Sequence, residues 1–100
     1  MIISNYLASE RYLFFLFSVS GYKRISSFWD FKKGTCEVDS LIASINTFAE
    51  NEKIMARFFL SIWFGENYGF DLIRDIAFLL PDDIGIINDW NLEPYIFRRN

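Results

Sequence analysis

Residues 51–65, NEKIMARFFLSIWFG, decide the fold of this chain. Asn51 is typical of a helix N-cap, Glu52 suits the positive end of the helix dipole, and Gly65 is typical of the residue that ends a helix. Between these signals, apolar side chains recur at the three- and four-residue spacing of one helix face. They are Ile54, Met55, Phe58, Phe59, Ile62 and Trp63. The pattern predicts an amphipathic helix that turns this face toward the core.

A second helical pattern comes just before the first. Asp39 or Ser40 can cap this helix, and Ser44 belongs to its polar face. Its apolar residues are Leu41, Ile42, Ile45, Phe48 and Ala49. Because only residues 50–52 separate the two patterns, we expect either one kinked helix or a tight helical corner.

Two further helices are predicted toward the C-terminus. The first covers residues 70–79, and Pro81 stops it because proline disfavours helical geometry in the residue before it. Its apolar residues are Phe70, Leu72, Ile73, Ile76, Ala77 and Leu80. Pro81 can then begin a last short helix over residues 82–90, which Gly85 weakens by about 1 kcal/mol relative to alanine.

The N-terminal part of the chain fits more than one structure. Ser4 or Asn5 can cap a first helix that runs to about Ser18. However, the run YLFFLF at residues 12–17 is apolar all round, so a buried helix and a buried strand both fit it. Residues 22–33 follow neither the helical nor the strand period, and we interpret them as a short helix or an irregular loop.

The fold class that these patterns predict is all-α. Typical domains have about 100 to 150 residues. We therefore expect residues 1–100 to form a single domain, a compact bundle of four or five short helices. The alternative is an α+β domain with a small hairpin near residues 12–31.

The composition excludes several kinds of chemistry. The chain has no histidine, which excludes an imidazole base, a histidine-activated nucleophile and a histidine metal ligand. Cys36 alone can form neither an internal disulfide nor a thiolate zinc site. We therefore predict that the protein is not an enzyme and that it has no cofactor and no metal site.

The apolar runs are too short to cross a membrane. The longest uncharged apolar run, residues 12–19, is far shorter than the roughly 20 residues that a spanning helix needs. The first residues also lack the basic start and the cleavage site of a signal peptide. We expect a cytoplasmic protein, and a lone reduced cysteine agrees with that compartment.

The net charge of −3 conceals a divided chain. Residues 1–36 carry five basic and two acidic side chains, a net charge of +3, whereas residues 37–97 carry eleven acidic and three basic ones, a net charge of −8. Arg98 and Arg99 account for the rest. An acidic C-terminal part attracts basic partners and repels nucleic acid. The plainer alternative is a solvated surface whose two halves neutralise each other.

The candidate partner-binding residues lie in this acidic part. They are Asp71, Asp75, Asp82, Asp83, Asp89, Trp90 and Glu93. Asp71 and Asp75 are four residues apart on one helix face, where they repel each other unless Arg74 or a partner's cation lies between them. Asp82 and Asp83 also suit an ordinary helix N-terminus. The carboxylates around them are of the kind that holds magnesium, but no lysine or histidine is near enough in sequence to act on a substrate.

Residues 22–33 interleave basic side chains with aromatic ones, as the surfaces of single-strand nucleic-acid binders do. However, the isoelectric point near 4.8 is far below that of a typical nucleic-acid-binding domain. We therefore expect these rings to anchor a loop in the core while its lysines face water. Direct binding to nucleic acid is not expected.

Aromatic residues make up 20% of the chain, and several of them are adjacent. Adjacent residues point about 100° apart on a helix, so one small core cannot receive both rings of every pair. The pairs are Phe14-Phe15, Phe28-Trp29, Phe58-Phe59 and Trp63-Phe64. Rings left outside would mark a protein interface, whereas the alternative is a helix that is buried on two sides.

These observations favour a small acidic protein-binding module. One form of it is an inhibitor or immunity protein that occludes a basic site on a partner enzyme, such as a nuclease or another effector that acts on nucleic acid. The acidic helices would steer the association, and the aromatic side chains would supply the buried contact. The alternative is a homodimeric structural or regulatory domain with no catalytic activity.

Overall fold

A computed structural model describes residues 13–14, 16–17 and 22–92. Most of these residues are helical, and the strands among them form one small hairpin, which confirms the all-α prediction in its coarse form. The elements in chain order are α2 (Lys23–Ser26), β1 (Trp29–Asp30), β2 (Thr35–Cys36), α3 (Val38–Ser44), η1 (Ile45–Thr47), α4 (Glu50–Phe64), α5 (Leu72–Asp75), η2 (Ile76–Phe78) and α6 (Pro81–Leu92).

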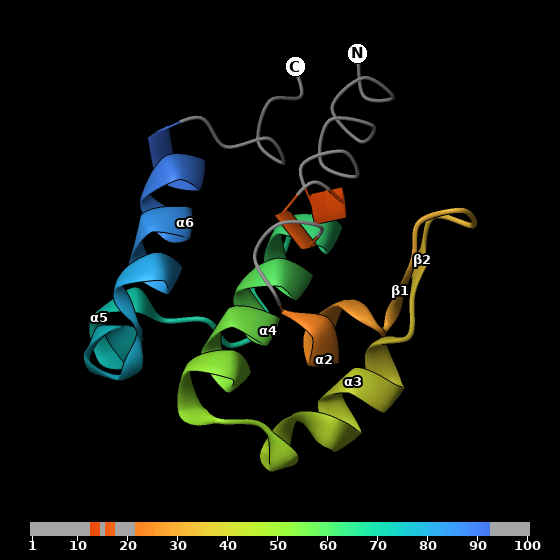
Figure 1. Cartoon of the computed structure of the whole chain (residues 1–100), viewed down its shortest axis with the longest axis horizontal. Coiled ribbons are helices and arrows are strands. Elements are labelled where there is room, and N and C mark those ends of the chain that lie inside the picture. Colours follow the sequence, from red (N-terminus) through yellow and green to blue (C-terminus); the bar gives the residue numbers. More distant parts are fainter. Residues whose placement is uncertain (1–12, 15, 18–21, 93–100) are drawn as a thin grey trace.

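Helix α4 lies in the middle of the molecule, with α6 on one side and the β1–β2 hairpin on the other (Figure 1). It begins at Glu50, one residue before the predicted cap Asn51. The reason is that Glu52 accepts a hydrogen bond from the backbone N–H of Ala49 at 3.0 Å, which completes the first turn there. The helix ends as predicted at Gly65, whose φ of 73° is the left-handed conformation that favours glycine.

The predicted apolar face of α4 is buried, and so is much of the opposite side. All six residues of the face are buried, and Ala56 and Leu60 are buried as well. Phe64, at the end of the helix, is exposed. Helix α4 is therefore a central helix and not a surface helix with one covered face.

The adjacent rings of Phe58 and Phe59 are both buried because α4 has neighbours on two sides. Phe58 packs edge to face on Trp90 of α6, with ring centroids 5.6 Å apart. Phe59 packs edge to face on Tyr22, which precedes α2, with ring centroids 5.2 Å apart. For this pair the alternative of a helix buried on two sides is the correct one.

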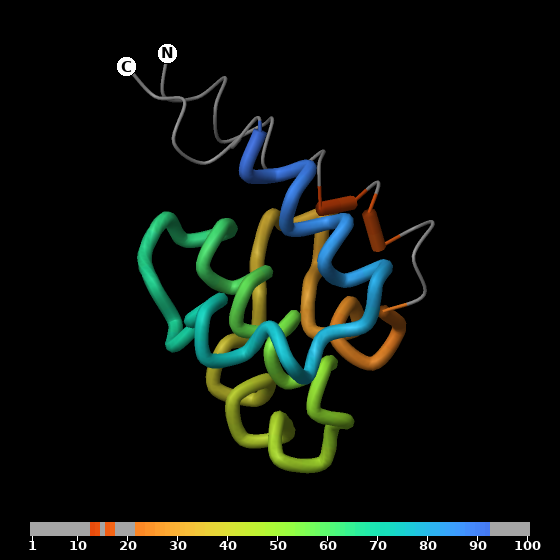
Figure 2. The backbone as a smooth tube through the Cα atoms, turned by 90° about the vertical axis from the view of Figure 1, so that its left-hand side faces the viewer, coloured from red at the N-terminus to blue at the C-terminus, as the bar shows by residue number. Residues whose placement is uncertain are grey.

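Helix α6 lies alongside α4 and runs in the same direction (Figures 1 and 2). Asn51 is hydrogen-bonded to Asp83 near the start of both helices. Phe58 contacts Trp90 seven residues further along each of them. Because the two helices are parallel, the chain that joins them, residues 65–80, has to run back along the molecule. These residues form the return segment, and the candidate site lies on it.

The return segment differs from the prediction. The single helix expected over residues 70–79 is instead the four-residue helix α5 followed by the 3₁₀ helix η2. Helix α5 begins at Leu72 because Asp71 is extended and acts as its N-cap. Pro81 ends this part as predicted, and it is the first residue of α6, where its missing N–H costs no helical hydrogen bond.

Helix α3 and η1 are separated from α4 by extended backbone at Phe48 and Ala49, so of the two alternatives the tight helical corner, and not one kinked helix, is found. Helix α3 begins at Val38, earlier than a cap at Asp39 or Ser40 would place it. Phe48 is extended and separates η1 from α4. Ile42 is exposed, whereas the buried residues of the predicted face are Leu41, Ile45 and Phe48.

The hairpin lies further along the chain than the α+β alternative placed it. Strands β1 and β2 are antiparallel, with Trp29 opposite Cys36. The Asp30 carboxylate accepts hydrogen bonds from the backbone N–H groups two and three residues ahead, each at 3.1 Å, and Gly34 has a φ of 67°. Because these turn residues follow position 30, the hairpin overlaps only the end of residues 12–31.

The N-terminal predictions are covered only in part by the structure. Leu13, Phe14, Leu16 and Phe17 are helical, as the helix alternative predicts. The remainder of the predicted first helix lies outside the described residues. Helix α2 is the short helix expected within residues 22–33.

Candidate functional site

The clearest departure from ordinary burial lies in α5, η2 and the link to α6. Four large apolar side chains are exposed there: Ile73 at 91%, Ile76 at 45%, Phe78 at 56% and Leu80 at 56%. Ile73 and Ile76 are three residues apart in helical backbone and so lie on the same side. These four residues are called the 73–80 surface below. Ile73, Ile76 and Leu80 belong to the apolar set of the helix predicted over this segment, but they do not face the core.

The inward side of the same segment carries a carboxylate. Leu72 is half-buried, Asp75 is only 6% exposed, and Leu79 is buried. These three positions have the i, i+3, i+7 spacing of one helix face. In the sequence, the apolar residues of this segment therefore fit two different faces. One face contains Ile73 and Ile76 and is exposed, and the other contains Leu72 and Leu79 together with Asp75 and turns inward. Because two faces fit the pattern equally, the sequence itself indicates that one apolar set could be left exposed.

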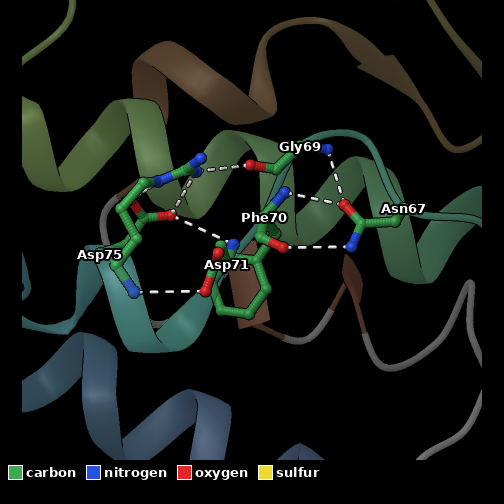
Figure 3. Close-up of polar contacts among 6 residues, drawn as sticks. Asn67, Gly69, Phe70, Asp71 and Asp75 are labelled. Carbon is green, nitrogen blue, oxygen red and sulfur yellow. Dashed lines mark hydrogen bonds and ion pairs between the residues drawn. The ribbon is translucent and has the colours of Figure 1, made fainter.

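A network of hydrogen bonds fixes this orientation (Figure 3). Asp71 accepts a hydrogen bond from the backbone N–H of Arg74 at 3.2 Å, and Asp75 accepts one from the backbone N–H of Asp71 at 3.2 Å. The guanidinium of Arg74 donates two hydrogen bonds to the Asp75 carboxylate, at 2.8 and 3.0 Å. It donates a third to the carbonyl of Gly69 at 2.8 Å. These bonds tie α5 to the turn before it.

That turn is held by the side chain of Asn67 (Figure 3). Its Oδ1 accepts hydrogen bonds from the backbone N–H groups of Gly69, at 2.7 Å, and Phe70, at 2.9 Å. Its Nδ2 donates one to the carbonyl of Phe70 at 3.1 Å. Gly69 has a φ of 93°, which a residue with a side chain rarely adopts. One asparagine therefore satisfies three backbone groups and fixes the direction in which the chain enters α5.

The ion pair within this network shifts the pKa values of both partners. The hydrogen bonds from Arg74 hold the pKa of Asp75 below its ordinary value, although burial of the carboxylate acts in the opposite direction. The hydrogen bonds to Asp75 raise the pKa of Arg74. The Arg74 guanidinium therefore pairs with Asp75, whereas the Asp71 carboxylate accepts the backbone N–H of Arg74.

Asp83 is a second buried carboxylate, with 2% of its surface exposed. It accepts hydrogen bonds from the hydroxyl of Tyr22, from Nδ2 of Asn51 at 3.1 Å and from the backbone N–H of Leu80 at 2.9 Å. Burial and the hydrogen bond to Asp83 raise the pKa of Tyr22. Because its donors come from three separate parts of the chain, Asp83 attaches the start of α6 to the body of the molecule.

The remaining predicted contact residues are placed differently. Asp82 and Asp89 are exposed and lie seven residues apart on α6, so they share one side of the helix. Trp90 is half-buried against Phe58. Glu93 lies outside the described residues. The exposed carboxylates of the predicted set within the described chain are Asp71, Asp82 and Asp89.

The aromatic residues among positions 22–33 turn toward the core. Tyr22 and Trp29 are buried, and Phe28 and Phe31 are half-buried. The lysines of this segment are exposed. The charged side chains of the segment are therefore exposed while its rings are buried or half-buried, which is the core-anchored arrangement expected from the sequence.

Cys36 is half-buried at the end of the hairpin. Burial, together with the neighbouring Glu37, raises the pKa of its thiol to about 12. At neutral pH the thiol is therefore protonated and is a poor nucleophile.

Within residues 13–14, 16–17 and 22–92, no three histidine, cysteine, aspartate or glutamate side chains are grouped closely enough to hold a metal ion. Across the same part of the chain, each helix is too short or too polar to span a membrane.

Similarity to known proteins does not indicate a function. The sequence matches no protein-family model, and neither a curated protein nor a solved structure is significantly similar to it.

Proposed function

We propose that the chain is a small protein-binding module that contacts its partner through the 73–80 surface. The observation that supports this most directly is the exposure of Ile73, at 91%, on a segment that turns a carboxylate inward. Large apolar side chains that are exposed together mark interaction sites, because burying them against a partner removes apolar area from water.

Acidic side chains flank this surface. Asp71 precedes it, Asp82 follows it, and Asp89 lies further along α6, all three exposed. Residues 71–92 carry five aspartates and one arginine, a net charge of −4. A matching partner has an apolar patch bordered by lysine and arginine. Opposite charges of this kind increase the association rate more than they tighten the complex.

The partner we propose is an enzyme that acts on nucleic acid, with a basic site that the module occludes. Such an enzyme uses lysine and arginine to hold phosphate groups. The exposed carboxylates of the module compete for the same cations, while the 73–80 surface supplies the apolar contact. In this role the module is a cytoplasmic inhibitor or immunity protein without catalytic activity of its own.

A homodimer is the second candidate, because the 73–80 surface can also pair with a second copy of itself. In a two-fold symmetric dimer the same patch of each copy meets the other. Asp71 and Asp82 of one copy then approach the same residues of the other copy. Repulsion between these like charges favours a different, basic partner over self-association.

The apolar contact is tested by comparing the proteins that wild-type and variant chains capture from a native extract. The double variant Ile73→Ser, Ile76→Ser removes two side chains of the 73–80 surface. The control Ile42→Ser removes an exposed isoleucine of α3. We expect the double variant to lose a partner that the wild type and the control both retain. Equal capture by all three proteins would show that this surface is not the contact.

The charge contribution is tested with the isolated partner. We expect Asp82→Lys to weaken binding and to reduce the dependence of affinity on salt, whereas the exposed Asp39→Lys changes neither. An unchanged salt dependence for Asp82→Lys contradicts the proposed role of charge. Sedimentation of the free protein at several concentrations separates the two candidates, because a dimer that forms with rising concentration supports self-association.

A further inference from the structure

A separate hollow of about 320 Å³ lies between the C-terminal half of α4, the turn that follows it and the end of α6. Its lining includes Phe58, Ile62, Phe70 and Trp90, together with the exposed Glu66. None of the four side chains of the 73–80 surface lines it. Its volume is near the lower end of the range for small-molecule sites, about 300 to 1,000 Å³.

The apolar wall is built from rings of three different elements. Phe58 of α4 packs against Phe70 of the turn, with centroids 5.2 Å apart, and against Trp90 of α6 at 5.6 Å. Phe58 and Ile62 are buried and belong to the central helix. The wall is therefore held in place before any ligand arrives, which reduces the entropy lost on binding.

The polar groups of the wall are already engaged in holding its shape. The hydroxyl of Ser61 donates a hydrogen bond to the carbonyl of Arg57 at 2.7 Å and accepts one from the backbone N–H of Tyr68 at 2.9 Å. The amide of Asn67 serves the backbone of the turn, as described above. The hollow thus offers a ligand mainly carbon surface and aromatic faces.

Glu66 is the charged residue of this site. It is exposed, and in the described part of the chain it takes part in none of the ion pairs, which join Arg24 with Glu52, Lys53 with Glu50 and Arg74 with Asp75. Residues 71–92, which follow Glu66 in the sequence, add a net charge of −4. An ammonium group at the edge of the hollow would gain from Glu66 and from the nearby aromatic faces.

We propose that this hollow binds a small organic amine whose apolar body, a single ring or a short alkyl chain, lies against Phe58, Phe70 and Trp90 while its ammonium group faces Glu66. The aromatic wall selects an apolar body, and the carboxylate selects a cation over an anion. The site is distinct from the 73–80 surface, so this proposal and the proposed function can fail independently.

Three probes that share a phenylethyl body and differ in the end group test the proposal: 2-phenylethylamine, 2-phenylethanol and 3-phenylpropionate. We titrate each into ¹⁵N-labelled protein and follow amide and indole resonances. The expected shifts are centred on residues 61–70 and on the indole of Trp90, with affinity falling from the amine to the alcohol to the carboxylate. Shifts centred elsewhere, no saturable binding of the amine at millimolar concentration, or equal affinity for amine and carboxylate would overturn the proposal.

Two variants separate charge from shape. Glu66→Gln should weaken amine binding about two- to fivefold and leave alcohol binding unchanged, as expected for an exposed ion pair. The control for the change in net charge is Glu37→Gln, because Glu37 is an exposed carboxylate that does not line this hollow. Ile62→Phe fills the hollow and should weaken the binding of both ligands. Glu66→Gln keeps the test decisive if the filled variant does not fold, and amine binding that is insensitive to Glu66→Gln contradicts the proposal.

Discussion

Helix α4 and residues 72–80 have similar apolar patterns in the sequence but opposite arrangements in the structure. In α4 every residue of the predicted apolar face is buried. In residues 72–80, Ile73 and Ile76 are exposed while Asp75 is buried. Helix α4 has fifteen residues and neighbours on two sides, whereas α5 has four residues and η2 has three.

The difference shows when a hydrophobic pattern decides the orientation of a helix. A long helix buries enough apolar area for that area to dominate, at about 25 cal/mol per Å². A helix of one turn has little such area. Its orientation then follows the polar bonds at its ends, here those of Arg74 with Asp75 and of Asp71 with the first turn. The apolar side chains left outside are the ones available to a partner.

The largest expected contrast comes from truncating a phenylalanine in each region. Phe59→Ala should destabilise the protein by about 3 to 5 kcal/mol, because it leaves a cavity in the core. Phe78→Ala, on the exposed surface, should change the free energy of unfolding by no more than about 0.5 kcal/mol. Denaturant unfolding followed by circular dichroism measures both. Similar losses of unfolding free energy for the two variants would mean that Phe59 and Phe78 are buried to a similar extent.

The next contrast is between two adjacent aspartates of α6. Asp83→Asn should cost about 1 to 3 kcal/mol, because it disturbs a buried carboxylate with three donors. Asp82→Asn should cost less than about 1 kcal/mol, the contribution of an exposed charge to the helix dipole. The same unfolding experiment compares them, and Tyr22→Phe, which removes one donor, should fall between the two. Equal effects at positions 82 and 83 would contradict the role given to Asp83.

Two glycines should respond to alanine with opposite signs. Gly65→Ala should destabilise the protein by about 1 to 2 kcal/mol, because its φ of 73° is strained for any residue with a side chain. Gly85→Ala should stabilise it by about 0.5 to 1 kcal/mol, since it lies within α6 and an added Cβ meets no atom within 4 Å. Thermal unfolding of the two variants measures the sign directly. Destabilisation by Gly85→Ala would argue against a helix at that position.

The smallest expected effect is a change in the pH dependence of stability. Arg74 lowers the pKa of Asp75 in the folded protein below its ordinary value of 3.8, so the unfolded chain binds this proton more tightly. Asp75 therefore stabilises the folded state above about pH 4, and this contribution is lost as the pH falls through the lower, folded pKa. Asp75→Asn should flatten the fall in stability below that pH, and Arg74→Gln should have the same effect. Unfolding free energies measured from pH 2 to 6 test this, and an unchanged slope contradicts it.

The sequence predicted those parts of the fold in which one signal dominates. The face of α4, its end at Gly65 and the stop at Pro81 all follow from local residue preferences that the surroundings support. Helix α4 starts two residues earlier than a cap at Asn51 predicts, because the side chain of Asn51 binds Asp83 and Glu52 supplies the capping bond instead. That exchange depends on a contact between distant parts of the chain.

The candidate site was predicted less well for a related reason. A sequence pattern places acidic residues at the surface and apolar residues in the core, which is the usual case. Asp83 departs from this usual case because three hydrogen-bond donors compensate the cost of burying its carboxylate. Asp75 departs from it because Arg74 and the backbone N–H of Asp71 donate hydrogen bonds to its carboxylate. Ile73 departs from it because the polar network of the turn outweighs the small area that it could bury.

The central claim is that the 73–80 surface is open to solvent in the free protein. Carbene footprinting with mass spectrometry measures the accessibility of individual side chains in a dilute, monomeric sample. The account predicts strong labelling of Ile73 and Phe78 and protection of Ile54 and Phe59. Protection of Ile73 and Phe78 equal to that of Ile54 and Phe59 would contradict it.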